Sequence, residues 1–470
     1  MKFWENDTIA AISTPIGESG IGIVRISGPK TLEIAQEVFR DKNLNRIKIK
    51  DFFSHTVHYG FIIDPESGEK IDEVILILMK KPQTYTREDT VEFNCHGGIL
   101  SLRKALETMI NCGARMAEPG EFTKRAFLNG RIDLSQAEAV IDLIQAKTER
   151  SLSSSLAQLG GSLNKKITDL MHSLIRISAE VEAPMDFPDQ DIEEKNPKKV
   201  EESINYILKE INFLIETLDY GKILKEGINT LITGKANVGK SSLFNTLLRE
   251  NRAIVTHLPG TTRDTIEELI NIKGTAFKII DTAGFKNPEN IIEKISIKKM
   301  IKHLKEAKLI LVMFDASVPL SLEDKEVIKE INKEKNENKK VIVIENKIDL
   351  SEKIDREKLL SLLDVKDSIK MSLKKKIGIE ELEEKLAMAA IEGLVIPENG
   401  VVINNVRQAN QLNRAKQALE HVLLGLKGKI TYDFLTIDLK DALDSLGEIT
   451  GDSINDEMVN DIFSRFCIGK

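Results

Sequence analysis

A short glycine-containing segment near the middle of the chain constrains the fold more than any other feature. Residues 234–241 have the sequence GKANVGKS, which follows the apolar run Ile228–Thr233 and precedes a helical pattern over residues 242–248. A strand, a loop spaced G-x-x-x-x-G-K-S and a helix together form a phosphate-binding loop. Its backbone N–H groups and the helix N-terminus both attract phosphate. The segment therefore predicts a nucleotide-binding α/β domain.

Individual residues of this loop have separate expected tasks. Gly234 and Gly239 let the backbone turn closely around the phosphates. Lys240 is expected to reach the β- and γ-phosphates, and the Ser241 hydroxyl to ligate Mg²⁺. Asn237 has two interpretations, between which the loop does not choose. It either ligates a monovalent cation beside the phosphates or simply tolerates a left-handed backbone conformation.

Two further motifs follow apolar strands later in the chain. Asp281-Thr282-Ala283-Gly284 comes after the strand Phe277–Ile280, where an Asp can hold Mg²⁺ through water. Asn346-Lys347-Ile348-Asp349 comes after the strand Val341–Ile344. The carboxylate of Asp349 can accept from N1–H and the 2-amino group of guanine, a donor pair that adenine lacks. The base is therefore predicted to be guanine.

These signals, with a last base-contacting loop at 372–374, resemble the G domain of GTPases over residues 227–392. In small GTPases a Gln often follows the Asp-x-x-Gly motif and orients the attacking water. Here that position is Phe285, so another group must orient water. In the segment 260–264 (GTTRD), Thr262 is the candidate for a second Mg²⁺ contact.

The ends of the chain add a wider resemblance. They carry GIGIVRISG at 20–28, PGEFTKRAFLNGRIDL at 119–134 and FCIGK at 466–470. With the loops 237–241 and 260–264, the chain resembles the MnmE (TrmE) family of bacterial tRNA-modification GTPases over essentially its whole length. The C-terminal Cys-Ile-Gly-Lys is a very specific part of that resemblance.

The resemblance implies a GTP site built from several loops. Its residues are Asn237, Val238, Gly239, Lys240, Ser241, Ser242, Thr256, His257, Leu258, Pro259, Gly260, Thr261, Thr262, Asp281, Thr282, Ala283, Gly284, Asn346, Lys347 and Asp349. Within this set, it implies that Ser241 and Thr262 hold Mg²⁺. The resemblance further implies a K⁺ site formed by Asn237, Thr256, Leu258 and Thr261, and a catalytic, water-orienting carboxylate at Glu293.

A second implied site binds 5-formyl- or 5,10-methylene-tetrahydrofolate through Arg25, Glu92, Arg131 and Lys470. A carboxylate suits the amide and amino edge of a pterin, and arginines suit planar or anionic groups. The family acts with the flavoprotein MnmG, in a heterotetramer, to add a carboxymethylaminomethyl group to C5 of the wobble uridine of certain tRNAs. Its G domains form a homodimer across the nucleotides.

Composition limits the partners and the compartment. The net charge is −7 and 30% of residues are charged, so a tRNA partner must use a local basic patch or another subunit. The chain has three cysteines, Cys95, Cys112 and Cys467, and no two of them form a Cys-x-x-Cys pair. This argues for a reducing cytosol and against a structural zinc site. No signal peptide or membrane-length apolar run is evident. A cytoplasmic protein without membrane contact is expected, and Cys467 is expected to be inert.

The expected fold is multidomain, α/β plus all-α. Residues 1–118 form an N-terminal α/β folate-binding and dimerisation domain, with strands at Ile21–Ser27, Val74–Met79 and Val91–Asn94 and helices at Thr31–Phe39 and Leu100–Asn111. Residues 119–226 and 393–470 form a helical domain, into which a Ras-like P-loop G domain at 227–392 is inserted. Helices are expected at Glu201–Leu218, Gln408–Leu426 and Leu439–Leu446, and a break at Ala183–Pro188.

A second function remains possible on the G-domain motifs alone, namely a ribosome-assembly or stress-response GTPase that acts as a binding switch. The folate residues near the N-terminus and the Cys467–Lys470 tail favour the tRNA-modifying enzyme, because a plain switch has no need of them.

Overall fold

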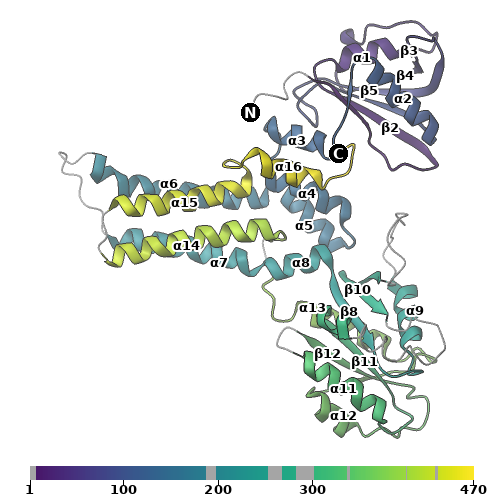
Figure 1. Ribbon diagram of the computed structural model, residues 1–470, viewed down its shortest axis with the longest axis vertical. Helices are drawn as coiled ribbons and strands as arrows, with labels where there is room; N and C mark the ends of the chain where they lie inside the picture. Colours follow the sequence, from purple (N-terminus) through teal and green to yellow (C-terminus); the bar gives the residue numbers. More distant parts are fainter. Residues whose placement is uncertain are drawn as a thin grey trace. The chain divides into compact units, whose positions relative to one another are not determined.

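The computed structural model of the chain describes residues 7–186, 197–251, 267–281, 301–335, 339–397, 400–428 and 432–470. Contacts divide the chain into two compact units. Unit 1 comprises Met1–Ile141, Leu159–His172 and Leu443–Lys470, and unit 2 comprises Asp142–Gln158 and Ser173–Ala442. Each unit contains its own β-sheet (Figure 1).

Unit 1 is built on a seven-stranded sheet of order β3-β4-β5-β6-β2-β1-β7. Neighbouring strands are antiparallel except for the parallel pair β1 and β7. The strands are β1 (Ile9–Ile12), β2 (Ser19–Ser27), β3 (Phe39–Asp41), β4 (Thr56–Ile63), β5 (Lys70–Met79), β6 (Thr90–Gly97) and β7 (Arg115–Met116). The helices lying wholly in this unit are α1 (Thr31–Val38), the 3₁₀ turn η1 (Ile49–Asp51), α2 (Ile99–Asn111), α3 (Glu121–Leu128) and α16 (Asp456–Ser464).

The core of unit 1 follows from the period of two along its strands. In β5, Val74, Leu76 and Leu78 are buried, whereas Ile75 between them is exposed. The buried set packs with Leu102 of α2 in one apolar cluster. One face of the sheet is therefore covered by helices, which is how an antiparallel sheet usually forms a core.

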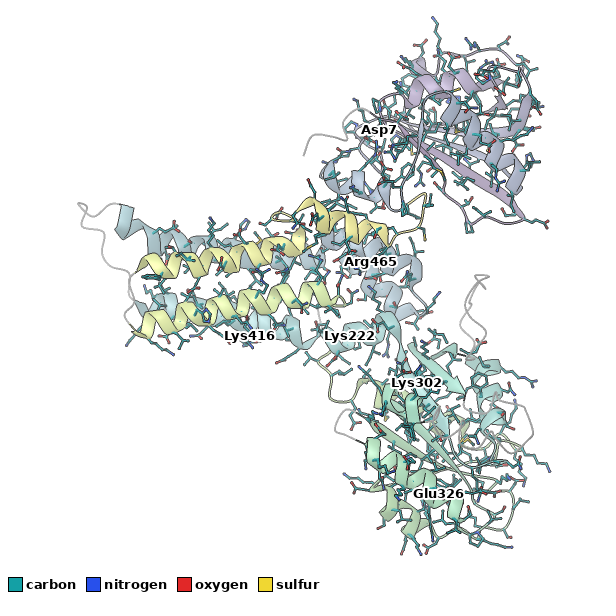
Figure 2. The ribbon with its side chains drawn as sticks, in the orientation of Figure 1. Asp7, Lys222, Lys302, Glu326, Lys416 and Arg465 are labelled. Atoms are coloured by element: carbon teal, nitrogen blue, oxygen red, sulfur yellow. The ribbon has the colours of Figure 1, made fainter. Side chains whose placement is uncertain are left out.

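An ionic network at the start of unit 1 fixes helix α3. The carboxylate of Asp7, labelled in Figure 2, lies 2.7 Å from Arg115 and 2.6 Å from Arg125. Both arginines also contact the buried Glu121 in the first turn of α3. Burial alone would raise the pKa of Glu121, but hydrogen bonds led by that from Arg115 outweigh burial, so the pKa lies below its usual value. The network holds the charged start of α3 in place beside β7.

Unit 2 contains a six-stranded sheet of order β13-β12-β11-β8-β10-β9. All neighbours are parallel except the antiparallel pair β9 and β10. The strands are β8 (Ile228–Thr233), β9 (Glu267–Ile272), β10 (Thr275–Asp281), β11 (Leu309–Asp315), β12 (Lys340–Asn346) and β13 (Ser368–Lys370).

Both faces of this sheet are buried. Along β11, Leu309, Leu311 and Met313 belong to one apolar cluster. The alternate residues Ile310, Val312 and Phe314 belong to a second cluster. A central strand that is apolar on both faces is typical of a parallel sheet covered by helices on each side.

The helices of unit 2 cover the sheet or extend away from it. Those that lie wholly in the unit are α7 (Pro197–Glu216), α8 (Leu218–Glu226), α9 (Lys240–Asn251), α11 (Leu322–Glu334), α12 (Arg356–Leu363), α13 (Ile379–Ile391) and α14 (Val406–Gly428). Helices α7 and α14 lie side by side (Figure 1). Helices with residues in both units are α4 (Leu134–Gln145), α5 (Glu149–Leu159), α6 (Ser162–Asp186) and α15 (Tyr432–Thr450).

Most of the expected elements are confirmed, and the predicted strand Ile228–Thr233 coincides with β8. The expected helix Thr31–Phe39 ends at Val38, because Phe39 begins β3, and the expected helix Glu201–Leu218 is interrupted at Thr217 between α7 and α8. Pro184 does not end α6, which continues to Asp186, so the break begins later than predicted. The segment Leu439–Leu446 is only the middle of α15. Among the described residues, none of the helices combines the length and apolar composition that a membrane span needs.

Candidate functional site

The phosphate-binding loop lies at the carboxyl end of β8, and α9 begins directly after it at Lys240. Gly234 has φ +143° and Gly239 has φ +112°, conformations that side chains rarely adopt. A Cβ added at Gly234 would lie 2.4 Å from the Met313 carbonyl oxygen, and one at Gly239 would lie 2.4 Å from Asn346 Nδ2. Both conformation and space therefore require glycine at these two positions.

The side chains of the loop differ in their contacts and in their exposure to solvent. Lys240 Nζ donates hydrogen bonds to the carbonyls of Gly234 at 2.8 Å and Lys235 at 2.7 Å. Ser241 and Ser242 are exposed in the first turn of α9. Val238 is buried beneath the loop. Asn237 is exposed with φ +61°, so the left-handed backbone is sufficient by itself to explain an Asn here.

The Asn-Lys-x-Asp motif at residues 346–349 is joined to the phosphate-binding loop through Asn346. Its Nδ2 donates to the Val238 carbonyl at 2.7 Å, and its Oδ1 accepts from the Leu373 N–H at 3.3 Å. Asp349 Oδ1 accepts from the Ser372 hydroxyl at 2.6 Å. That hydrogen bond lowers the pKa of Asp349, so the carboxylate stays ionised. An ionised, fixed Asp349 suits the donor pair of guanine.

Lys347 is held by a residue that the sequence analysis did not name. It has φ +68°, and its Nζ lies 2.6 Å from Asp315 Oδ2 at the end of β11. Burial alone would raise the pKa of Asp315, but hydrogen bonds from Lys347 and Ser317 outweigh burial and lower it. Asp315 ends an apolar strand, the same signal that identified Asp281 and Asn346.

Lys235 is also held by an unnamed residue. Its Nζ lies 2.7 Å from Asp324 Oδ2, and Asp324 is 3% exposed. Asp324 closes a capping box at the start of α11, where Ser321 Oγ accepts from the Asp324 N–H at 3.2 Å. The spacing Ser-x-x-Asp before an amphipathic run was the available signal. The second residue of the phosphate-binding loop is thus anchored to α11.

The motifs meet at one edge of the sheet, because β8, β10 and β12 are parallel members of it and their carboxyl ends lie together. Asp281 is the last residue of β10 and pairs with Ile232 of β8. The remaining predicted residues of this site lie outside the described part of the chain. They are Thr256, His257, Leu258, Pro259, Gly260, Thr261, Thr262, Thr282, Ala283, Gly284 and Glu293.

The predicted folate residues lie in unit 1. Arg25 of β2 and Glu92 of β6 are directly opposite in the sheet, and Arg25 Nε lies 2.7 Å from Glu92 Oε1. Arg25 Nη1 also donates to the carbonyl of Gly469 at 3.2 Å. The two residues and the C-terminal tail therefore form one cluster.

The tail is fixed by close backbone contacts. Gly469 has φ +89°, and a Cβ there would lie 2.5 Å from the Ile12 carbonyl oxygen. The Gly120 N–H donates to the Cys467 carbonyl at 3.2 Å. Cys467 itself is exposed with a free thiol, and Lys470 is half-buried.

Arg131 and Arg25 each contact an aromatic ring, and these two rings belong to the same part of unit 1. Its guanidinium lies 4.7 Å from the centre of the Tyr85 ring, and that of Arg25 lies 5.5 Å from the Phe122 ring. Tyr85 packs against the same small apolar cluster that contains Phe122. Arg131 also lines a cleft of about 520 Å³ together with Asp133, a carboxyl group with its pKa raised by burial.

A phosphate-binding loop that follows β8, with Asn-Lys-x-Asp at the end of β12 two strands away in the same sheet, defines the P-loop GTPase class. Family models carry the assignment further. Residues 8–131 match the model described as "GTP-binding protein TrmE N-terminus", and residues 134–467 match the "MnmE helical domain". The chain belongs to the MnmE (TrmE) family.

Related proteins are similar in sequence over the full length of the chain. The tRNA modification GTPase MnmE of Lactiplantibacillus plantarum is 46% identical over 99% of both chains, and that of Thermoanaerobacter pseudethanolicus is 48% identical over 99% of both. The solved G domain of the T. maritima FeoB iron transporter is 31% identical and covers 34% of this chain and 97% of its own, with a TM-score of 0.26. That score is too low to add to the assignment.

Proposed function

We propose that the protein is a GTPase that acts in tRNA modification. The observation that carries the proposal is the full-length similarity to proteins named tRNA modification GTPase MnmE, at 46% identity over 99% of the chain. The loops at the edge of the sheet in unit 2 would supply a phosphate cradle, and Asp349, held by Ser372, would accept from guanine. GTP would bind across residues 237–242, 256–262, 281–284 and 346–349.

Mg²⁺ would be held by Ser241, whose hydroxyl is exposed at the start of α9, and by Thr262. A hydroxyl oxygen beside a triphosphate suits this hard cation. Glu293 would orient the attacking water, because Phe285 cannot do so by a side-chain hydrogen bond. For a test, Glu293→Ala should bind GTP normally and hydrolyse it at least about tenfold more slowly. Glu326→Ala, on the exposed face of α11, is the control. An unchanged rate in Glu293→Ala would assign water positioning to another group.

K⁺ would be bound by Asn237, Thr256, Leu258 and Thr261, where it would neutralise charge that develops on the phosphates. GTP turnover is expected to be several-fold higher in KCl than in NaCl. Asn237→Gly separates the two interpretations of this residue, since glycine keeps the φ of +61° but has no amide oxygen. Loss of the KCl effect in Asn237→Gly would support the role of Asn237 as a K⁺ ligand. Retention of the KCl effect would leave Asn237 with only its backbone role.

A reduced folate, 5-formyl- or 5,10-methylene-tetrahydrofolate, would bind in unit 1 at Arg25, Glu92, Arg131 and Lys470. Support comes from the contact of Arg25 with both Glu92 and the Gly469 carbonyl. In a calorimetric titration with 5-formyltetrahydrofolate, Arg25→Met and Glu92→Gln should each weaken binding at least about tenfold. Arg103→Met, an exposed residue of α2, is the control. Absence of binding to the unaltered protein would remove the folate assignment.

The remaining parts of the proposal concern partners and organisation. The protein would act in the cytoplasm as a homodimer, with the flavoprotein MnmG in a heterotetramer, on C5 of the wobble uridine of certain tRNAs. Residues 1–118 would form the folate-binding and dimerisation domain. Residues 119–226 and 393–470 would form the helical domain, with the G domain 227–392 inserted. Co-purification with MnmG and analysis of wobble uridines in a deletion strain test these assignments.

A further inference from the structure

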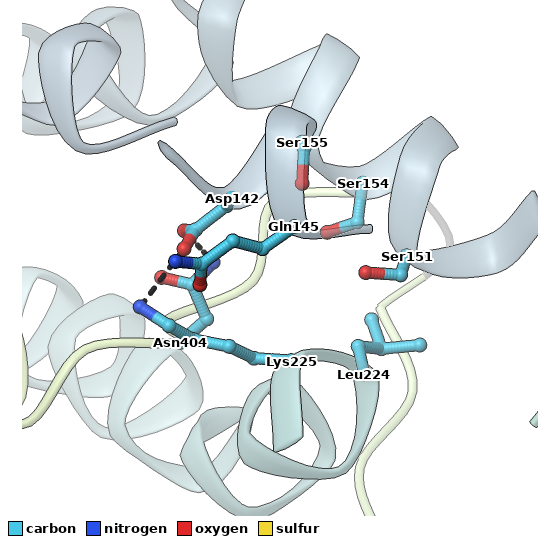
Figure 3. A pocket seen from close by; sticks show the side chains of 8 residues that line it. All are labelled: Asp142, Gln145, Ser151, Ser154, Ser155, Leu224, Lys225 and Asn404. Carbon is cyan, nitrogen blue, oxygen red and sulfur yellow. Dashed lines mark hydrogen bonds and ion pairs between the residues drawn. The ribbon is translucent and has the colours of Figure 1, made fainter. Parts of the chain in front are cut away.

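Two connections link the six-stranded sheet of unit 2 to helices of the same unit, and one carboxylate contacts both. The first connection comprises Thr217, α8 and Gly227, which lead into β8, and the second is the segment between α13 and α14. Oδ1 of Asp142, in α4, lies 2.8 Å from Nζ of Lys225, in α8. Its Oδ2 accepts from Asn404 Nδ2 in the second connection at 2.8 Å. Figure 3 shows these side chains around one small polar pocket.

The two connections also contact each other directly. The Ile403 N–H donates to the Thr217 hydroxyl at 3.0 Å, in a buried position at the start of α8. A Cβ on Gly221 would lie 2.1 Å from the Ile403 carbonyl oxygen, so the backbone of the second connection runs against α8. Movement of the sheet relative to α4 must therefore act on α8 and on residues 403–404 together.

The side chain of Asp142 is buried, that of Lys225 is 33% exposed, and the polar atoms around Asp142 are not all hydrogen-bonded. Asp142 is 5% exposed, and the neighbouring Gln158 is 4% exposed. Asn404 Nδ2 also lies 3.3 Å from Gln158 Oε1. Within the described residues, Asn404 Oδ1 and Gln158 Nε2 are buried without a hydrogen-bond partner, and Asp142 Oδ1 has only its ion pair with Lys225. A buried charge with spare donors and acceptors around it can exchange partners without leaving a charge unpaired.

We propose that Asp142 is a positioning residue that clamps both connections and transmits the nucleotide state of the sheet to the helices. Lys225 is two residues before Gly227 and β8, the strand that ends at the phosphate-binding loop. A shift of β8 on hydrolysis would therefore reach Asp142 through α8. This inference rests on the proposed function, because it assigns to Asp142 the coupling between GTP hydrolysis and tRNA modification.

The test compares full-length variants of the clamp. Asp142→Asn keeps an acceptor for Asn404 and removes the charge that pairs with Lys225. Lys225→Met keeps the aliphatic stem and removes the ammonium. Lys222→Met, in the same helix and with no ion pair among the described residues, is the matched control. Each is assayed for GTP turnover, and for uridine modification with the flavoprotein and tRNA.

We expect GTP turnover of Asp142→Asn and Lys225→Met to stay within about twofold of the unaltered protein, and modified uridine per GTP hydrolysed to fall about tenfold or more. The double variant should be no worse than either single variant, since both changes break one contact. Equal loss of both activities would make Asp142 a merely structural residue and overturn the proposal. Unchanged coupling, or the same effect in Lys222→Met, would also overturn it.

A second readout does not depend on tRNA. Amide hydrogen exchange of α4 and α8 is compared with GDP and with a non-hydrolysable GTP analogue bound. In the unaltered protein, exchange in α4 should differ between the two states, and in Asp142→Asn this difference should disappear. If the unaltered protein fails to modify tRNA but shows the exchange difference, the proposed function fails and the clamp stands. No difference in the unaltered protein would refute the clamp itself.

Discussion

At the scale of single residues, we expect the base specificity of the proposed nucleotide site to depend on the ionised carboxylate of Asp349. Ser372 fixes this carboxylate by a hydrogen bond of 2.6 Å. Asp349→Asn places an amide donor where guanine also donates. GTP affinity should fall at least about 100-fold, because two hydrogen bonds to a charged group are lost. Xanthosine triphosphate, which offers a carbonyl acceptor at that position, should bind better than GTP.

Competitive nucleotide titration measures this change. Asp364→Asn is the control, because the Asp364 side chain is 99% exposed at the end of α12. A variant at position 349 that still prefers GTP would show that another group selects the base.

Lys235 supplies a second residue-scale prediction, this time on stability. Lys235→Met leaves the carboxylate of Asp324 buried without its cation, which should lower the free energy of unfolding by about 2–4 kcal/mol. Lys273→Met should change it by less than about 0.5 kcal/mol, because the ion pair with Glu384 is exposed on both sides. Urea unfolding measures both.

A double-mutant cycle identifies the cause. Adding Asp324→Asn to Lys235→Met should recover part of the loss, since the unpaired charge is then removed. If the two changes are simply additive, the ion pair does not hold the loop.

Sequence could predict the residues whose role depends on local spacing. The loop 234–241 and Asn346 with Asp349 are identified by their neighbours along the chain. Lys235 pairs with a residue 89 positions away, and Asn404 with one 262 positions away. No spacing rule joins such partners, because only the packed fold brings them together. The same holds for the contact of Arg25 with Gly469.

At the scale of elements, the strands predicted from sequence were those followed by a motif or with clear alternation. The strand β11 was not named, although it is apolar throughout, because a short apolar run has no period that distinguishes a buried strand from a buried helix. Strands β7 and β13 have 2 and 3 residues, too few for any pattern. Their positions follow from pairing with β1 and β12.

Gly221 gives a prediction at this scale, since it lies inside a helix where alanine is normally favoured by about 1 kcal/mol. The added Cβ would lie 2.1 Å from the Ile403 carbonyl oxygen. Because the backbone of either α8 or residue 403 must move to make room, Gly221→Ala should lower the free energy of unfolding by about 2–3 kcal/mol. Gly17→Ala, with no atom near its Cβ, should change stability by less than about 0.5 kcal/mol.

Chemical denaturation of the two variants provides the comparison. A Gly221→Ala protein as stable as the original would mean that residues 403–404 are not held against α8. The clamp proposed around Asp142 would then lose one of its supports.

At the scale of the whole molecule, each unit has its own sheet and its own apolar clusters. Two ligands are proposed, one for each unit, so each should stabilise a different part of the chain. At about 100 times its dissociation constant, a ligand adds about 2.7 kcal/mol to the stability of the part that binds it. For units of about this size, about 1 kcal/mol raises the unfolding temperature by about 2–4 °C, so about 2.7 kcal/mol corresponds to an upward shift of roughly 5–11 °C.

Calorimetry of the full chain should therefore resolve two unfolding transitions. GDP should raise the unfolding temperature of unit 2 only, and 5-formyltetrahydrofolate that of unit 1 only. ATP, the control nucleotide, should raise neither temperature. A single transition that responds equally to both ligands would contradict this independence, since the two units would then unfold as one. In that case GTP hydrolysis in unit 2 would act on unit 1 through shared stability, and the contacts of Asp142 would be one route of coupling among several.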